Sequence, residues 1–199
     1  MNLKKFFTFI FFIAISFSNI SNSYSIEPDI FVQSTVNRAS QALSNQFSKN
    51  EKVKKLKNIA KETVDIKGIG FYTLGPIRKK LNDQQKKEYS ILFEQYFLKS
   101  FSSRLAEYTN PEIDVYSKEI LNKNYTIVNS LLKSTKDRPE VKIDWRIYTK
   151  NPDNFLIRDL IIEGLSLART QKEEFTSILS SNNDDISMLF KNLKKFINN

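Results

Sequence analysis

The side chains available for acid–base or nucleophilic chemistry are few, because the chain contains no histidine and no cysteine. A serine–histidine–acid triad, an imidazole base, the usual histidine-rich zinc site and thiol catalysis are therefore excluded. The remaining option is a carboxylate whose pKa is raised in a pocket, and Asp144, Asp159 and Glu163 fall in predicted strands. No polar substrate contacts accompany them, so we interpret these acids as paired or solvent-facing and expect a protein that is not an enzyme.

Two short motifs that could bind a nucleotide or a metal have simpler explanations. The Gly-x-Gly that begins at Gly68 follows no predicted strand and lacks a third glycine at the dinucleotide spacing, so it indicates close helix packing before a Gly-Pro stop at Gly75. The adjacent Asp184 and Asp185 are typical of a helix start, as an N-cap and an acidic first-turn residue. We therefore expect no metal and no cofactor.

Helical periodicity dominates the first half of the chain. Apolar residues recur every three or four positions from Val32 to Phe47 and from Val53 to Val64, and a longer helix is predicted from Asp83 to Tyr108 after an Asn82–Gln85 capping box. The long helix carries an unusually aromatic stripe: Tyr89, Phe93, Tyr96, Phe97 and Phe101, joined by Leu92 and Leu105. Taken alone, such a stripe indicates burial in the protein's own core.

Short extended runs follow, separated by polar turns rich in Asn, Asp and Pro. The predicted strands are Ile113 to Ile120, Tyr125 to Leu132, Glu140 to Thr149 and Phe155 to Gly164. Two more helices are predicted at the end, Ser166 to Ser180 and Asp184 to Ile197. Helices, then an antiparallel meander, then helices favour an α+β fold in which a curved four-stranded sheet has its apolar face covered by helices.

The first residues have the pattern of a secretory signal peptide. A basic start with Lys4 and Lys5 precedes an apolar run from Phe6 to Ile15, which is about half the length that spans a bilayer. We expect residues 1–25 to be removed during export to the periplasm, leaving one domain of residues 26–199. Without cysteine, that domain has neither disulfides nor a lipid-modified cysteine, so its stability must come from its core alone. We expect it to be a monomer.

The exported chain would be basic. The full chain has 31 basic and 22 acidic residues, and removal of Lys4 and Lys5 leaves a formal charge of +7. This charge favours acidic partners and transient contact with anionic membrane surfaces. Nucleic acid is a poor candidate, because the lysines from Lys49 to Lys61 lack interleaved aromatic residues that stack bases.

Three segments of the chain, residues 159–175, 71–75 and 89–108, together resemble the MlaC family of periplasmic phospholipid-binding proteins, also called the toluene-tolerance family. Residues 159–175, DLIIEGLSLARTQKEEF, match its Glu-Gly-Val/Ile-Ser strand end and the helix that follows, with Leu165 where valine is common. Residues 71–75, FYTLG, resemble a segment that ends in Val-Leu-Gly, and residues 89–108 carry the aromatic spacing. The resemblance covers nearly the whole of residues 26–199.

The resemblance implies a cystatin-like or nuclear-transport-factor-like sheet (about 112–164), a helical part (about 28–110) and C-terminal helices (about 166–198), with lipid tails in a pocket between sheet and helices. It also implies a carrier that shuttles phospholipid between an outer-membrane lipoprotein complex and an inner-membrane ABC transporter, and so maintains outer-membrane lipid asymmetry. The aromatic stripe would then meet acyl chains. The predicted lipid-binding residues are Phe71, Leu74, Phe93, Phe97, Phe101, Ile143, Trp145, Ile147, Leu160 and Ile162.

Several alternatives remain open at this stage. The last predicted strand is apolar on both faces, so Leu160 and Ile162 could exchange places with Ile157 and Ile161. Another bulky lipid such as a hopanoid could replace phospholipid. A small-molecule enzyme on the same fold would need a buried carboxylate with a polar partner, and a plain interaction module would have a filled core without a cavity.

Overall fold

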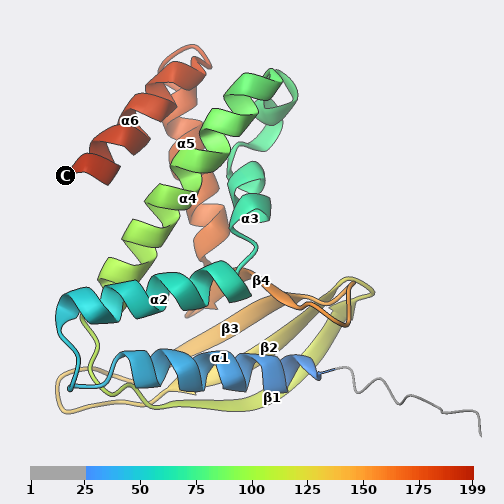
Figure 1. Cartoon of the computed structure of the whole chain (residues 1–199). Helices are drawn as coiled ribbons and strands as arrows, with labels where there is room; N and C mark the ends of the chain where they lie inside the picture. Colours follow the sequence, from blue (N-terminus) through green and yellow to red (C-terminus); the bar gives the residue numbers. More distant parts are fainter. Residues whose placement is uncertain (1–25) are drawn as a thin grey trace, which may run out of the picture.

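The computed structural model describes residues 26–199, so the predicted signal peptide lies outside the described residues (Figure 1). A curved sheet forms the base of the molecule, some helices run along it, and the others rise upright from it. The helices are α1 (Pro28–Ala42), α2 (Lys49–Thr63), α3 (Ile66–Thr73), the short 3-10 helix η1 (Gly75–Lys79), α4 (Asp83–Leu105), α5 (Leu167–Ser180) and α6 (Ile186–Asn198).

The sheet is an antiparallel meander, as the alternating strands and polar turns predict. Its strands lie in chain order: β1 (Ile113–Asn122), β2 (Tyr125–Leu132), β3 (Val141–Tyr148), β4 (Leu156–Ile162) and β5 (Leu165–Ser166). The α+β class with a curved antiparallel sheet is confirmed, but the sheet has five strands and not four. The fifth strand arises because Glu163 and Gly164 adopt positive φ angles of 50° and 81°, which form a tight turn that returns the chain along β4.

Side-chain caps start four of the long helices, among them α5, where the Ser166 hydroxyl accepts from the backbone amide of Arg169. Ser48 and Glu51 form a capping box at α2, and Asn82 and Gln85 form the predicted one at α4. At α6 the cap is Asp185, whose side chain accepts a hydrogen bond from the backbone amide of Ser187. The predicted N-cap, Asp184, is therefore one residue early and the predicted start of the helix two residues early, because Asp184 lies before the cap with a φ of 61°.

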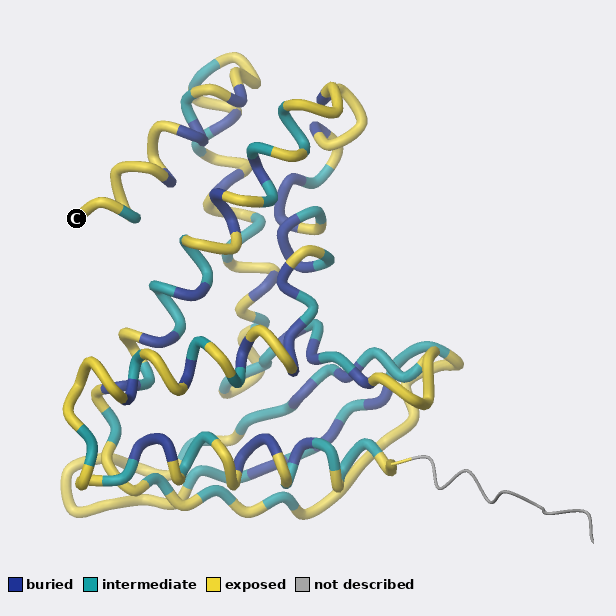
Figure 2. The backbone as a smooth tube through the Cα atoms, viewed as in Figure 1, coloured by how far each residue is buried: buried dark blue, intermediate teal, exposed yellow. Residues whose placement is uncertain are grey.

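The helices divide into a group that contacts the sheet and a group that packs mainly on other helices. Helix α1 lies on β1 and β2, while α3 and α5 contact β4. The long helix α4 packs on α2, α3 and α6. Buried segments face inward from both groups, and Figure 2 shows them as dark stretches along the helices and the middle strands. One main hydrophobic core therefore extends from the sheet into the upright helices.

A close approach fixes α3 against α4, as the Gly-x-Gly motif indicates. A Cβ atom on Gly70 would lie 2.7 Å from the ring of Phe93, so only glycine leaves room for this packing. Beside it, the Tyr89 hydroxyl donates to the Gly70 carbonyl oxygen at 3.1 Å and lies 2.7 Å from the Thr73 hydroxyl. Burial raises the pKa of Tyr89 above its usual range, so this hydroxyl keeps its proton.

A β-bulge in β4 resolves the ambiguous strand register. Trp145 pairs with Leu160, whereas two residues further along β3 Ile147 pairs with Ile157, so Arg158 is the extra residue. Because paired residues share a face of an antiparallel sheet, the bulge places Ile157 on the same inner face as Leu160. Ile162, which pairs with Ile143, also lies on that face, and Ile161 lies on the other.

Candidate functional site

The inner face of the sheet is a continuous apolar surface. Ile143, Trp145 and Ile147 of β3 lie beside Val128 of β2 and Leu160 of β4, as the strand pairing requires. The polar atoms on this face are satisfied internally. The Trp145 indole nitrogen donates to the Ser130 hydroxyl at 2.8 Å, and that hydroxyl donates to the Ile143 carbonyl oxygen at 3.1 Å. No polar group of this Trp–Ser pair therefore needs water.

The surroundings of the aromatic stripe differ between the two halves of α4. In the N-terminal half, Tyr89 and Phe93 are only 1% and 2% exposed. Further along, Phe97 and Phe101 are only partly buried, although their rings stack on each other with centroids 5.6 Å apart. Large apolar side chains that are neither buried nor fully exposed indicate a surface that can still accept an apolar partner.

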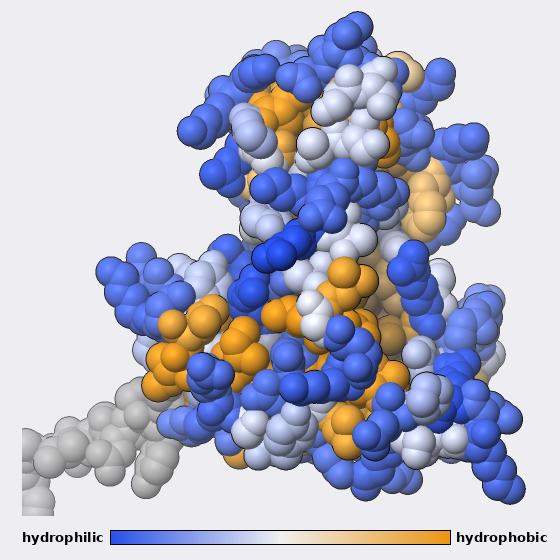
Figure 3. Space-filling view, turned by 180° about the vertical axis from the view of Figure 1, so that it is seen from behind, coloured by the Kyte–Doolittle hydropathy of each residue, from blue (hydrophilic) through white to orange (hydrophobic). Residues whose placement is uncertain are grey.

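The half-buried residues of the sheet and of α4 gather at the same end of the molecule. The sheet contributes Ile143, Leu160 and Ile162, near the end where β1 begins, and the C-terminal end of α4 lies over that end (Figure 1). Seen from behind, Figure 3 shows hydrophobic residues in a hollow between the upright helices and the sheet. We call the five predicted residues that are partly buried at this end of the molecule the recess residues: Phe97, Phe101, Ile143, Leu160 and Ile162.

The predicted binding residues separate into two groups. Five of them are the recess residues. The other five are Phe71, Leu74, Phe93, Trp145 and Ile147, of which all except the partly buried Phe71 are buried in the main core. Leu74 and Phe93 pack among the helices, whereas Trp145 and Ile147 belong to the inner face of the sheet. Their roles in ligand binding stay predictions, and the recess residues and Phe71 are the ones that combine apolar character with accessible surface.

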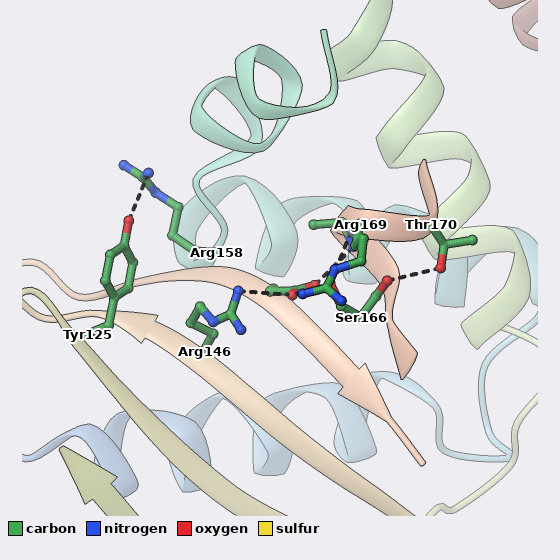
Figure 4. Close-up of polar contacts among 8 residues, drawn as sticks. Tyr125, Arg146, Arg158, Ser166, Arg169 and Thr170 are labelled. Atoms are coloured by element: carbon green, nitrogen blue, oxygen red, sulfur yellow. Dashed lines mark hydrogen bonds and ion pairs between the residues drawn. The ribbon is translucent and has the colours of Figure 1, made fainter. Parts of the chain in front are cut away.

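The acids considered for catalysis are engaged in structural contacts. Asp159 is 3% exposed and accepts hydrogen bonds from the Ser166 hydroxyl at 2.6 Å and the Ala168 amide at 3.0 Å. Arg146 lies 3.5 Å from the same carboxylate (Figure 4). These bonds join β4 to the start of α5. Among the other two acids, Asp144 accepts from the Asn129 amide and Glu163 from the backbone amide of Lys142.

A second polar cluster attaches the start of α3 to the edge of the sheet. The guanidinium of Arg158, the bulge residue, pairs with Asp65 and lies 4.6 Å from the centre of the Tyr148 ring. It also lies 3.5 Å from the Tyr125 hydroxyl (Figure 4). Asp65 in turn accepts from the Gly68 amide and so caps α3. Both polar clusters hold helices in place around the sheet, and the acid in each is paired with an arginine.

A family model for the "MlaC protein" matches residues 32–195, which is most of the chain. The chain belongs to the MlaC family. No curated protein matches it closely enough in sequence to be reported. A solved structure that does match is a phospholipid-binding protein from Ralstonia solanacearum in complex with a phospholipid. The two structures superpose with a TM-score of 0.73 at 16% sequence identity, over 86% of this chain and 97% of that one, which shows that they share a fold.

In this MlaC-family protein, one residue that lies beside the recess residues was not predicted from the sequence patterns. Leu165 of β5 pairs with Ile162, so both side chains share the inner face, yet Leu165 is 59% exposed. The row Ile143, Ile162, Leu165 therefore runs from the partly buried sheet to solvent. The available signal was the Glu163–Gly164 pair, which is typical of a tight hairpin turn and places the residues on either side of it opposite each other.

Two open cavities lie away from the recess in this MlaC-family protein. The larger, about 560 Å³, is bounded by α2, α4 and the end of α6, and the other, about 460 Å³, lies between α4 and α6. Within residues 26–199, no helix is long and apolar enough to cross a membrane. The same residues contain no cluster of three acidic side chains that could hold a metal ion.

Proposed function

We propose that this protein is a phospholipid carrier and that the recess receives the acyl chains. The observation that carries the proposal is the recess: partly buried aromatic residues of α4 and aliphatic residues of the sheet lie at the same end of the molecule, and hydrophobic residues are seen in a hollow between the upright helices and the sheet. Membership of the MlaC family and the shared fold with a protein solved in complex with a phospholipid support the same ligand.

Apolar burial supplies the affinity in this proposal. Each methylene that moves from water into the recess contributes about 0.8 kcal/mol, so a single acyl chain provides a substantial driving force. The head group stays outside, where the basic surface of the protein favours the phosphate. No bond is made or broken, and the carrier needs no catalytic residue. Transfer follows from a difference in affinity between the carrier and the site that receives the lipid.

The proposal extends to the route of the lipid. We propose that the carrier acts in the periplasm after export and exchanges phospholipid with an outer-membrane lipoprotein complex and an inner-membrane ABC transporter. The N-terminal pattern of residues 1–25 supports export, and the family resemblance supports both partners. In this role the protein helps to keep phospholipid out of the outer leaflet of the outer membrane.

Lipid extraction tests the ligand directly. The protein lacking residues 1–25 would be purified from a bacterial periplasm, extracted with organic solvent and analysed by mass spectrometry. We expect phospholipid in near-stoichiometric amount. A protein that comes out empty and also fails to take up labelled phospholipid from vesicles would contradict the proposal. Stoichiometric hopanoid or another bulky lipid in place of phospholipid would keep the carrier but overturn the assigned ligand.

A further inference from the structure

The larger open cavity is a groove with a basic rim, separate from the recess. One face of α2 forms its first wall, α4 forms the second, and the end of α6 closes it. Its lining residues are Asn50, Val53, Lys54, Lys57, Asn58, Lys61, Gln95, Leu98, Lys99 and Ile197. The α2 members recur at intervals of three and four residues, so they lie along one side of that helix.

The charge of the groove is almost entirely positive. Four lysines line it, and the paired acid is Glu94, whose carboxylate lies 3.5 Å from the Lys61 ammonium. Lys99 donates to the Ile197 carbonyl oxygen at 2.9 Å, which holds its charge beside the groove. Within residues 26–199, Lys54 and Lys57 form no ion pair with a carboxylate. These two ammonium groups are therefore free to pair with an external anion.

The floor of the groove is apolar. Leu98 is buried beneath it, and Val53 and Ile197 are half-buried along its sides. A lysine rim above an apolar floor favours a ligand that carries both negative charges and an apolar side chain. Because the groove is a concave space of about 560 Å³ between helices, it fits an elongated protein segment better than the flat surface of a bilayer.

We propose that this basic groove docks an acidic, amphipathic segment of a partner protein, with carboxylates on Lys54 and Lys57 and an apolar side chain against Val53 and Leu98. The surface is independent of lipid binding, since none of the recess residues lines it. Docking of this kind would place the carrier in a defined orientation on its partner. Charge pairing across the rim would raise the rate of association and make it sensitive to salt.

A designed peptide provides the probe. It would be a fluorescein-labelled amphipathic helix with Asp and Glu along one side and Leu at helical spacing, and its control would have the same composition in scrambled order. Fluorescence anisotropy would measure binding to the lipid-loaded protein and to the double variant Lys54→Glu/Lys57→Glu. The matched control is Lys123→Glu/Lys150→Glu, which makes the same change in net charge at exposed turns of the opposite sheet end.

We expect the ordered peptide to bind more tightly than the scrambled one, and the groove variant to weaken binding by about tenfold, whereas the control variant changes it by less than about twofold. Phospholipid uptake by the groove variant should stay normal, which separates this surface from the recess. Equal weakening by both double variants would show non-specific charge attraction and overturn the proposal. A membrane contact would replace the proposal under two conditions. The wild-type protein would fail to bind the peptide, and the groove variant would no longer co-sediment with phosphatidylglycerol vesicles.

Discussion

The two halves of the aromatic stripe on α4 have the same residue types and the same spacing but different surroundings. Tyr89 and Phe93 are enclosed by α3, α5 and α6, where their rings contact Phe175 and Phe190. Phe97 and Phe101 lie further along the helix and remain half-buried beside the recess. One amphipathic pattern therefore forms core at one end and a partly exposed apolar surface at the other, depending on what the fold places opposite.

The strongest way to test the core half is Phe93→Ala. This ring fills the space above Gly70 and contacts Phe97 and Phe175, so its removal leaves a cavity in a well-packed region. We expect a loss of about 3–5 kcal/mol in the free energy of unfolding. Urea denaturation followed by circular dichroism would measure it, and a loss below about 1 kcal/mol would show that this end of the stripe is as loosely packed as the recess.

The recess half is tested by Phe97→Glu. A carboxylate at this half-buried position must be desolvated before an acyl chain can enter, so we expect uptake of labelled phospholipid to fall by at least about tenfold. Stability should change less than for Phe93→Ala, because the new charge can still reach water. The matched control is Ile91→Glu, since Ile91 lies on the same helix with 51% of its surface exposed. A folded Phe97→Glu protein that loads normally would remove Phe97 from the site.

A smaller effect is expected for Tyr89→Phe in the core half. The substitution keeps the ring but removes the hydroxyl that donates to the Gly70 carbonyl oxygen, while Thr73 still donates to that oxygen at 2.7 Å. We expect a loss of about 1 kcal/mol in stability and unchanged lipid uptake. Thermal unfolding and the uptake assay would be run on the same samples. A marked loss of uptake at normal stability would mean that the core half takes part in binding.

The smallest effect is expected at the exposed end of the recess, with Leu165→Ser. Leu165 continues the row of Ile143 and Ile162 but is mostly exposed, so stability should change by less than about 0.5 kcal/mol. If the row guides an acyl chain into the recess, the rate of uptake falls about threefold. Stopped-flow fluorescence would measure this rate. Ile120→Ser, an exposed strand residue at the other end of the sheet, is the control, and equal rates for both variants would exclude Leu165 from the entry path.

Much of the fold follows from local patterns in the sequence. Capping at Asn82, the polar turns between strands and the alternation around Trp145 each correspond to an element of the structure. The predicted end of α4 is Tyr108 and the helix ends at Leu105, because the amides of Glu107 and Tyr108 bond to the carbonyl three residues back and not four. The fifth strand was missed because two residues carry too little pattern to show as a strand.

The site was less predictable than the fold. The sequence identified all five recess residues only together with five others, because periodicity reports which side of an element is apolar and not what lies opposite it. The register of β4 was also open. The bulge residue Arg158 pairs with Asp65 and lies over the Tyr148 ring, and the pattern of the strand itself does not reveal either contact. The acids behaved as predicted: Asp159 and its neighbours are paired in structural contacts.

The sequence by itself determined which chemistry is absent, which segments are helix or strand, and which residues are apolar enough to meet a lipid. These are properties of residue type and spacing, and they need no knowledge of distant contacts. Only the tertiary structure decided that Phe93 is enclosed while Phe97 is half-open, and that Leu165 joins the row of Ile162. The physical reason is that the burial of a side chain depends on which element packs against it, and this packing forms only when the whole chain folds.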